Sequence, residues 1–229
     1  MWMLNAMSFS PAVACISLFV LFATLLYFNI LWRRKKSLSK GRVVLFTRFP
    51  EPGTTKTRLI AELGEAGAAR VQLYMTDHML NVLAEFQKRK TDTAVEVKVS
   101  GGNVSQIDHW LERKGFPHER FSWSMQCGGH LGIKMAETFD SAFKKGNEIA
   151  VIIGSDIPAI DPDLLETALD KLNHSDCEMI LGPAKDGGYY LVGLRQEVKH
   201  KLGDLNSLFE GIEWGTSKIR QQQLDVASH

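Results

Sequence analysis

The chain has 229 residues, with 27 lysines and arginines, 26 aspartates and glutamates, and a formal net charge of +1. A balance so close to neutral gives no basic surface for nucleic acid, and outside residues 33–36 the cations are scattered among carboxylates. No CxxC pair and no Cys/His cluster with zinc-ligand spacing is present, which argues against a zinc domain. Without about 40 N-terminal residues, the remainder is long enough for one α/β domain with a sizeable core.

Residues 1–36 are predicted to form a membrane anchor. Pro11–Trp32 is uncharged over 22 residues, and as a helix it would span about 33 Å, close to the hydrocarbon thickness of a bilayer. Four basic residues, Arg33–Lys36, follow it directly, so the positive-inside rule predicts a single-pass protein with its catalytic domain in the cytoplasm. The alternatives are a buried hairpin and a misassigned start of the chain. Residues 37–41 are the predicted linker.

The domain from residue 42 onward begins with a short, apolar, β-branched run that is typical of a buried strand, Arg42–Thr47. The elements predicted after it are a loop at Arg48–Leu59, a helix over 65–88, a strand at Ala94–Val99 and a helix at Ser105–Gly115.

The second half continues the alternation of strands and helices. It contains a loop at Gln126–Met135 that runs into a helix ending at Phe143, a strand at Glu148–Pro158, a helix at Pro162–Leu172 capped by Asp161, a strand at Cys177–Ala184, and a turn followed by a strand at Asp186–Leu194. This alternation predicts βαβ units and a mostly parallel sheet, in which ligands sit at the carboxyl ends of the strands.

The loop after the first strand is a candidate diphosphate site. Pro52 and Gly53 shape it, Gly53 because glycine tolerates a positive φ. A helix starting near Thr55–Lys56 would direct free backbone N–H groups at a phosphate, and Lys56 and Arg58 add charge beside them. The glycine spacing is not that of a Walker A loop. The alternative is a proline-rich turn with surface cations.

Two carboxylates are predicted at strand ends. Asp156 follows the clearest strand and Ser155, while Asp186 precedes Gly187 and Gly188. Mg²⁺ or Mn²⁺ prefers such hard oxygen ligands together with phosphate oxygens, so both aspartates are candidate catalytic and metal-binding residues. The alternatives are a capping aspartate at position 156 and a plain hairpin turn at position 186.

Further candidates surround these three segments. The glycines of the acidic turn allow a ligand to approach the backbone closely, and Tyr189 and Tyr190 point to opposite faces of their strand, so only one of them is expected to line a pocket. Gln126 and His130 flank a glycine pair and are expected to contact the substrate, although a structural role is the commoner one for such a histidine.

Five motifs in this order resemble the arsenosugar-biosynthesis-type glycosyltransferase family: FTRFPEPGTTKTRL, QCGGHLGIKM, GSDIPAIDPDLL, LGPAKDGGYYLVGL and LFEGIEWGTSKI. The resemblance runs from about residue 42 to about residue 222. It implies a three-layer α/β/α fold with a mostly parallel central sheet, the nucleotide-diphospho-sugar transferase (GT-A-like) fold. The family usually continues with a final strand and helix, so the domain at 42–229 is expected to be C-terminally truncated.

The resemblance also carries residue roles. Lys56 and Arg58 match the family's cationic loop and Asp156 its metal-type strand end. The acidic turn matches from Asp186 to Tyr189, and Trp214 and Thr216 match a late motif on the acceptor side. The chain departs from the pattern at His130, where an acid is usual, at Lys134, where an arginine is usual, and at Arg48, where a lysine is usual.

The sequence therefore predicts a glycosyltransferase that uses a nucleotide-diphosphate sugar and Mg²⁺ or Mn²⁺. Two alternatives stay open: a nucleotidyltransferase that joins a nucleoside triphosphate to an acceptor, and a non-catalytic nucleotide-binding protein at a membrane. The sugar, the base, the acceptor and the oligomeric state are not readable from the sequence.

Overall fold

The computed structural model describes residues 40–114, 121–174 and 176–227. The chain divides into two units, Met1–Leu38 and Ser39–His229, and every described element belongs to the second. The predicted anchor, with its helix at residues 11–32, lies outside the described residues. Of the helices that the structure does describe, none is long and apolar enough to cross a membrane. The predicted linker ends early, because Gly41 is already the first residue of a strand.

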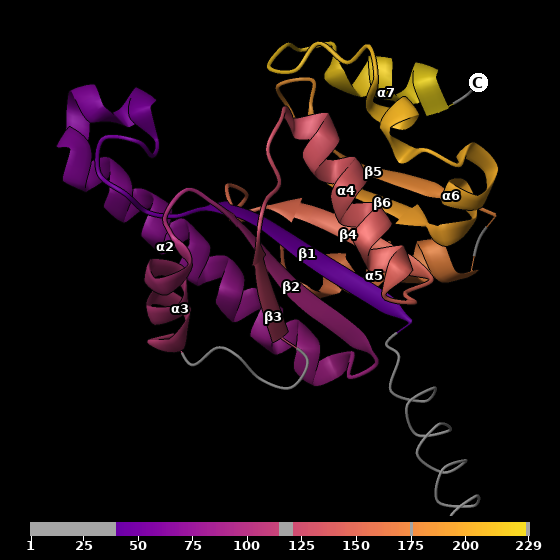
Figure 1. The fold of residues 1–229 in the computed structure, drawn as a ribbon, viewed down its shortest axis with the longest axis horizontal. Coiled ribbons are helices and arrows are strands. Elements are labelled where there is room, and N and C mark those ends of the chain that lie inside the picture. The colour runs from indigo at the N-terminus through magenta and orange to yellow at the C-terminus, as the bar shows by residue number, and fades with distance from the viewer. Residues whose placement is uncertain (1–39, 115–120, 175, 228–229) are drawn as a thin grey trace, which may run out of the picture. The chain divides into compact units, whose positions relative to one another are not determined.

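A six-stranded sheet forms the centre of the second unit (Figure 1). Its strands are β1 (Gly41–Arg48), β2 (Thr93–Ser100), β3 (Phe121–Met125), β4 (Ile149–Gly154), β5 (Met179–Pro183) and β6 (Tyr189–Arg195). They lie in the order β3-β2-β1-β4-β6-β5. The first four pair in parallel, whereas β6 is antiparallel to both β4 and β5. The predicted mostly parallel sheet is confirmed.

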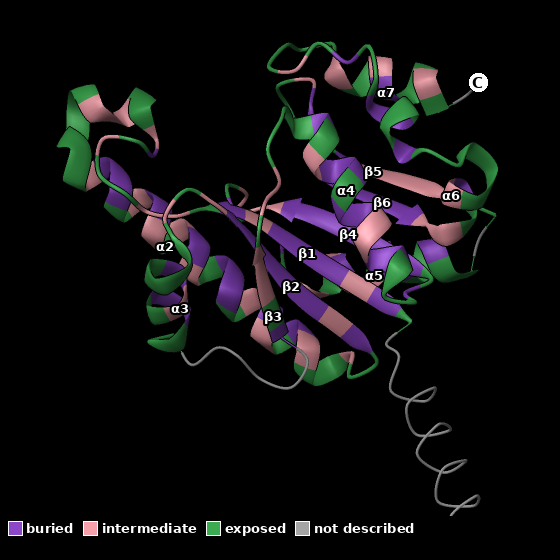
Figure 2. Ribbon diagram, viewed as in Figure 1, coloured by how far each residue is buried: buried purple, intermediate pink, exposed green. Residues whose placement is uncertain are grey.

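Helices cover both faces of this sheet and make a three-layer arrangement. The first apolar cluster joins one face to α2 (Ile60–Arg89), α3 (Val104–Glu112) and α5 (Pro162–His174). The second joins the other face to α4 (Leu131–Lys144), α6 (Gln196–Leu202) and the 3-10 helix η2 (Leu205–Phe209). A 3-10 turn, η1 (Thr57–Leu59), precedes α2, and α7 (Ile219–Ala227) follows η2. Figure 2 shows that most strand residues are buried between the helical layers.

The central strands form as predicted because their side chains are apolar on both faces. In β1, Val43 and Leu45 pack into the first cluster and Val44 into the second. β4 pairs with β1 in register, with Val43 opposite Val151. Strands buried on both sides are typical of parallel sheets. The two strands therefore end side by side at the centre of the sheet, and so do the loops that follow them.

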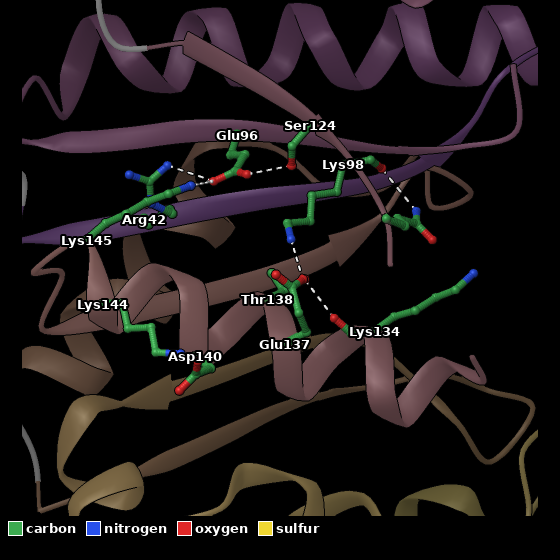
Figure 3. Close-up of polar contacts among 11 residues, drawn as sticks. Arg42, Glu96, Lys98, Ser124, Lys134, Glu137, Thr138, Asp140, Lys144 and Lys145 are labelled. Atoms are coloured by element: carbon green, nitrogen blue, oxygen red, sulfur yellow. Dashed lines mark hydrogen bonds and ion pairs between the residues drawn. The ribbon is translucent and has the colours of Figure 1, made fainter. Parts of the chain in front are cut away.

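The strand β2 buries charge on one of its faces (Figure 3). The Glu96 carboxylate accepts hydrogen bonds from Arg42 at 2.9 Å, Ser124 at 2.8 Å and Lys145 at 3.0 Å. The Lys98 ammonium lies 2.5 Å from Glu137 on α4. A buried charge is tolerated only when it is paired and hydrogen-bonded, and both conditions hold here. These contacts of Glu96 and Lys98, called the charged layer below, connect β2 to β3 and to α4.

Two parts of the fold differ from the sequence prediction. The loop after β1 does not run straight into a long helix: η1 occupies Thr57–Leu59, and α2 is broken at Gly64, where φ is 67° and ψ is 169°. The regular part of α2 therefore starts beyond Gly64, as the predicted helix over 65–88 does. The edge strand β3 and the C-terminal helices α6 and α7 were not predicted. The capping of α5 is confirmed, since Asp161 Oδ1 accepts from the Leu164 amide at 2.8 Å.

Candidate active site

A cavity of about 480 Å³ opens at the carboxyl edge of the sheet, where β1 and β4 end and β6 begins. Five of the predicted site residues line it: Lys56, Gln126, Ser155, Asp156 and Tyr189. The residues predicted with them that do not line it are Pro52, Gly53, Arg58, His130, Asp186, Gly187, Gly188, Trp214 and Thr216. The structure thus brings together the loop after β1, the end of β4 and the start of β6.

An ion pair joins two of the predicted residues across this cavity. The Lys56 ammonium lies 2.5 Å from Asp156 Oδ2, and the two side chains are 20% and 57% exposed. A pair so accessible to water contributes little to stability, about 1 kcal/mol at most. Its interest lies in its position, because it places a cation and a carboxylate at the ends of adjacent central strands.

The backbone at Lys56 adopts an unusual conformation. Among the residues that the structure describes, Lys56 is the only non-glycine residue with a positive φ, at 51°, and its ψ of 43° places it in the left-handed region. This conformation costs a side-chain-bearing residue roughly 1–2 kcal/mol. The neighbouring Thr55 is fully buried and donates to the Phe49 carbonyl at 2.9 Å, which holds the loop in place. Gly53 has a φ of 79°, so the predicted positive φ is confirmed.

A short helical segment follows Lys56. The 3-10 turn η1 begins at Thr57 with Lys56 as its N-cap residue, and the first residues of α2 continue it from Ile60 to the break at Gly64. The predicted helix start near Thr55–Lys56 is therefore close to the observed one, but Gly64 separates this short segment from the main part of α2. Arg58 is exposed on η1, so the loop keeps its cationic character, and phosphate binding there stays a prediction.

A buried set of hydroxyl groups lies behind Asp156. The side-chain nitrogen of Gln72 on α2 lies within hydrogen-bond distance of Thr47 Oγ1 at 3.1 Å, Thr76 Oγ1 at 3.1 Å and Ser155 Oγ at 3.2 Å, and its two hydrogens are shared among these three acceptors. Thr47 lies 2.7 Å from Thr76 and donates to Ser155 at 3.3 Å, and Ser155 donates to Asp156 Oδ1 at 3.3 Å. Gln72 and Thr47 also line the cavity. Sequence reasoning found Ser155 and Asp156 but missed the three residues that support them.

Gln126 ties the ends of two strands together at the cavity wall. Its side-chain amide donates to the Thr47 carbonyl at 3.1 Å and to the Lys98 carbonyl at 3.0 Å, and its backbone amide donates to the Val99 carbonyl at 2.9 Å. Its amide donors therefore bind carbonyl groups of the protein itself, and the residue still lines the cavity.

The acidic turn is folded against the C-terminal segment. Asp186 Oδ1 accepts from the Gly188 amide at 3.0 Å, and the Arg220 amide donates to the Gly187 carbonyl at 3.0 Å. Gly187 has a φ of +88°, and a Cβ there would lie 2.0 Å from the Ser217 carbonyl oxygen. The close backbone approach expected at Gly187 is thus made to the chain's own segment. In the described ranges, no group of three or more His, Cys, Asp or Glu side chains could hold a metal ion.

Both tyrosines at the start of β6 line the cavity. Tyr189 packs on the second apolar cluster and Tyr190 on the first, so they point to opposite faces as predicted. The expectation that only one of them would line a pocket is wrong, because the cavity lies at the end of the sheet and receives side chains from both faces. Tyr189 donates to Gln223 Oε1 at 3.1 Å, and burial raises the pKa of its phenol.

His130 and Trp214 line a second cavity of about 680 Å³. The N-terminal end of α4 contributes to both cavities, with Leu131 and Met135 in the first, and Gly132 and the N-cap residue His130 in the second. Both His130 and Trp214 approach Gly132, since a Cβ there would lie 3.1 Å from each side chain. Thr216 lines neither described cavity, and its hydroxyl donates to the Glu213 carbonyl at 2.9 Å.

Several solved structures share this fold. A protein of Desulfovibrio desulfuricans G20, named a "putative nucleotide-diphospho-sugar transferase", is 29% identical, with a TM-score of 0.66 over 82% of this chain and 74% of that one. A 4-diphosphocytidyl-2C-methyl-D-erythritol synthase from Anaerococcus prevotii is 7% identical, with a TM-score of 0.52 over 82% and 84% of the two chains. A nucleotidyl transferase from Methanothermobacter is 16% identical, with a TM-score of 0.50 over 81% and 83%. The latter two show the fold alone.

Comparison of sequences gives the family. No curated protein matches the chain. The sequence model of one family, described as an uncharacterised protein conserved in bacteria (DUF2064), matches residues 83–216, which is more than half of the chain. The matched stretch runs from the last two turns of α2 through the end of β4 to the acidic turn and beyond η2. With the fold of the nucleotide-diphospho-sugar transferases, the chain belongs to this DUF2064 family.

Proposed function

We propose that the protein is a metal-dependent glycosyltransferase that uses a nucleotide-diphosphate sugar. The observation that carries this proposal is the pair of Lys56 and Asp156, which meet over a cavity at the ends of the two central strands. The transferase fold shared with a relative of 29% identity supports it. So does the order of the five motifs, which resembles the arsenosugar-biosynthesis-type glycosyltransferases.

The donor set at Asp156 fits a Mg²⁺ or Mn²⁺ ion. Its carboxylate is more than half exposed at the cavity and already attracts a cation, the Lys56 ammonium. These metals are commonly held by one or two carboxylates together with phosphate oxygens of the substrate, which is the set that Asp156 and a diphosphate would provide. Bound there, the ion would neutralise charge on the leaving diphosphate. The proposal keeps Asp186 as a second carboxylate, although its side chain does not line the cavity and its Oδ1 accepts a hydrogen bond from the Gly188 amide.

The protein's own residues would bind and orient the donor. Lys56 exchanges its contact with Asp156 for a phosphate oxygen, and Arg58 adds a planar donor from the same loop. The acceptor hydroxyl oxygen attacks the anomeric carbon of the sugar. The bond from that carbon to the diphosphate oxygen breaks, the nucleoside diphosphate leaves, and the hydroxyl proton is released.

A nucleotidyltransferase is the second candidate function. The loop that carries Lys56 directly follows β1 and faces the cavity, a position equally suited to a triphosphate. A non-catalytic nucleotide-binding protein is the third, and its support is His130, which stands where the resembling family has an acid. The released product separates the first two functions, and nucleotide binding without metal dependence would favour the third.

The test is a product assay with the full-length protein. Panels of nucleotide-diphosphate sugars and nucleoside triphosphates are incubated with candidate acceptors and Mn²⁺. Release of a nucleoside diphosphate supports glycosyl transfer, whereas pyrophosphate supports nucleotidyl transfer. Asp156→Asn is expected to lower the rate at least about a hundredfold. Asp163→Asn, at an aspartate on α5, is the matched control. Undiminished Mn²⁺-dependent turnover by Asp156→Asn would show that the metal assignment is wrong.

We also propose that residues 11–32 anchor the protein in a membrane, with the catalytic domain on the cytoplasmic side. The uncharged run of 22 residues and the basic cluster at residues 33–36 support this. Protease treatment of intact and of opened cells tests it, since a cytoplasmic domain is cleaved only after opening. Release of the full chain from membranes by alkaline carbonate would contradict the anchor.

A further inference from the structure

The hydroxyl groups behind Asp156 form a chain with one direction. An ionised carboxylate only accepts hydrogen bonds, so Ser155 must donate its proton to Asp156 Oδ1. Ser155 can then only accept from Thr47, and Thr47 in turn accepts from Thr76. Each hydroxyl has one proton to donate. Because the carboxylate can only accept, all three hydroxyl protons point along the chain toward Asp156.

This direction determines the orientation of the Gln72 side chain. Its terminal group lies 3.1–3.2 Å from all three hydroxyl oxygens. Because their protons are already committed along the chain, the group that faces them must be a donor. An amide has two donor hydrogens on nitrogen and none on oxygen. Nε2 therefore faces the hydroxyls, and the reverse orientation would place a carbonyl oxygen against oxygens that have no proton to give.

The position of Gln72 makes it costly to replace this contact by water. The residue is 3% exposed, and Thr76 and Ser155 are buried beside it. Gln72 and Thr76 are four residues apart on α2 and so lie on the same side of that helix. Ser155 directly follows β4, and Thr47 is the second-last residue of β1. One side chain thus connects a helix to both central strands at the point where Asp156 leaves the sheet.

We propose that Gln72 is a positioning residue for Asp156, and that it acts through Ser155. Its amide donors favour the orientation in which the hydroxyl groups donate toward the carboxylate. Ser155 then donates to Asp156 Oδ1, while Oδ2 remains directed at the cation. The inference rests on the proposed function, in which Asp156 binds the metal. Outer groups that orient a metal ligand contribute measurably to affinity, and their loss typically costs about 10–100-fold.

The direct test is the binding of Mn²⁺ alone to the full-length protein. The electron paramagnetic resonance signal of the unbound ion measures how much Mn²⁺ remains free. Asp156→Asn is expected to abolish binding, and Ser155→Ala to weaken it about tenfold. Gln72→Leu keeps the approximate shape, removes the donors and is expected to weaken binding about tenfold as well. The matched control is Gln87→Leu, the same change on the same helix outside the hydroxyl chain, which should leave the affinity unchanged.

A double-mutant cycle separates positioning from a purely structural role. If Gln72 acts through Ser155, Gln72→Leu has little further effect in the Ser155→Ala background. Additive losses would overturn the route through Ser155. A second measurement needs no metal: the Gln72 Nε2 protons should show nuclear Overhauser contacts to the Thr47 and Thr76 methyl groups. Their absence would mean the opposite amide orientation and would overturn the proposal.

The outcomes also distinguish this inference from the proposed function. If Asp156→Asn loses Mn²⁺ while Gln72→Leu binds like Gln87→Leu, the role of Gln72 is overturned and the metal site stands. If the wild-type protein binds no Mn²⁺ either alone or together with a nucleoside diphosphate, or if Asp156→Asn binds it equally well, both proposals are overturned.

Discussion

Lys56 combines a charged side chain with a left-handed backbone. The conformation positions its ammonium 2.5 Å from Asp156. Glycine would adopt the same backbone without strain. A residue that retains strain at a cavity is a reasonable candidate for function, because a position selected only for stability would favour glycine.

Two substitutions of Lys56 separate the effect of its backbone strain from the effect of its charge. Lys56→Gly removes both, whereas Lys56→Ala removes only the charge. Both variants are expected to bind nucleotide diphosphates about tenfold more weakly, because each loses a charged donor. In urea unfolding, Lys56→Gly should be about 1 kcal/mol more stable than Lys56→Ala. Lys88→Ala, at an exposed lysine on α2, should change neither quantity. Equal stabilities of the two Lys56 variants would contradict the strain.

At the scale of elements, the charged layer under α4 determines how firmly β2 and β3 are held. Burial by itself raises the pKa of the Glu96 carboxyl, but hydrogen bonds from Lys145 and Ser124 and the charges of Lys145 and Arg42 outweigh it. The net pKa of Glu96 therefore lies below its ordinary value. A carboxyl with a lowered pKa in the folded state stabilises the fold above its unfolded-state pKa, and this stability is lost as the pH falls through the folded-state pKa.

Substitution of Glu96 should therefore produce a pH-dependent loss of stability. Glu96→Gln leaves Arg42 and Lys145 without their anion and is expected to cost about 3 kcal/mol at pH 7. The difference from the wild type should shrink below about pH 4.5, the ordinary pKa of a glutamate, because the carboxyl of the unfolded wild type takes up a proton there and that of the folded protein does so only at lower pH. Urea unfolding across this range measures it. Glu85→Gln, on the exposed face of α2, is the control, and a constant difference at all pH values would refute the assignment.

The elements that the sequence predicts well are those with a strong local signal. β1 and β4 are short apolar runs, and α5 starts with Asp161 and a proline. β3 has only five residues at the edge of the sheet, and α7 buries only Gln223, so neither has the apolar period that marks a strand or helix.

The same limit explains which site residues were missed. Asp156 and Lys56 are recognisable in the sequence because each is a charged residue in the segment that follows an apolar strand, β4 and β1 respectively. Gln72 and Thr76 lie on the buried stripe of α2 together with Ala69 and Met79, and two polar residues on an apolar stripe are a usable signal. Their contacts with Thr47 and Ser155 could not be inferred, because these contacts join residues that are 25 and 83 positions away from Gln72.

At the scale of the whole domain, the strand order explains why the site is where it is. β1 lies between β2 and β4, so the chain leaves β1 to build one side of the sheet and later returns to build the other. Ligands of open α/β sheets bind at such a switch point, outside the carboxyl ends of the strands. Because β6 runs antiparallel, its first residues reach the same edge and add Tyr189 and Tyr190 to the cavity.

The contact between the acidic turn and the C-terminal segment gives a prediction at this scale. Gly187→Ala would place a methyl group 2.0 Å from the Ser217 carbonyl oxygen at a positive φ, and is expected to cost about 3 kcal/mol. Gly215→Ala, at a φ of +87° with no neighbour within 4 Å, should cost about 1 kcal/mol from backbone strain alone. Denaturant unfolding and hydrogen exchange at the Arg220 amide measure both. Equal costs would mean that the segment moves away easily.

The same contact has a consequence for the order in which the protein matures. All six strands lie between residues 41 and 195, whereas the segment that packs against Gly187 follows at residues 217–220. Synthesis proceeds from the N-terminus, so every described strand and the pair of Lys56 and Asp156 are made before the segment that packs against the turn at Asp186. Because a domain generally folds as one unit, the last residues made are the ones that complete this wall of the site.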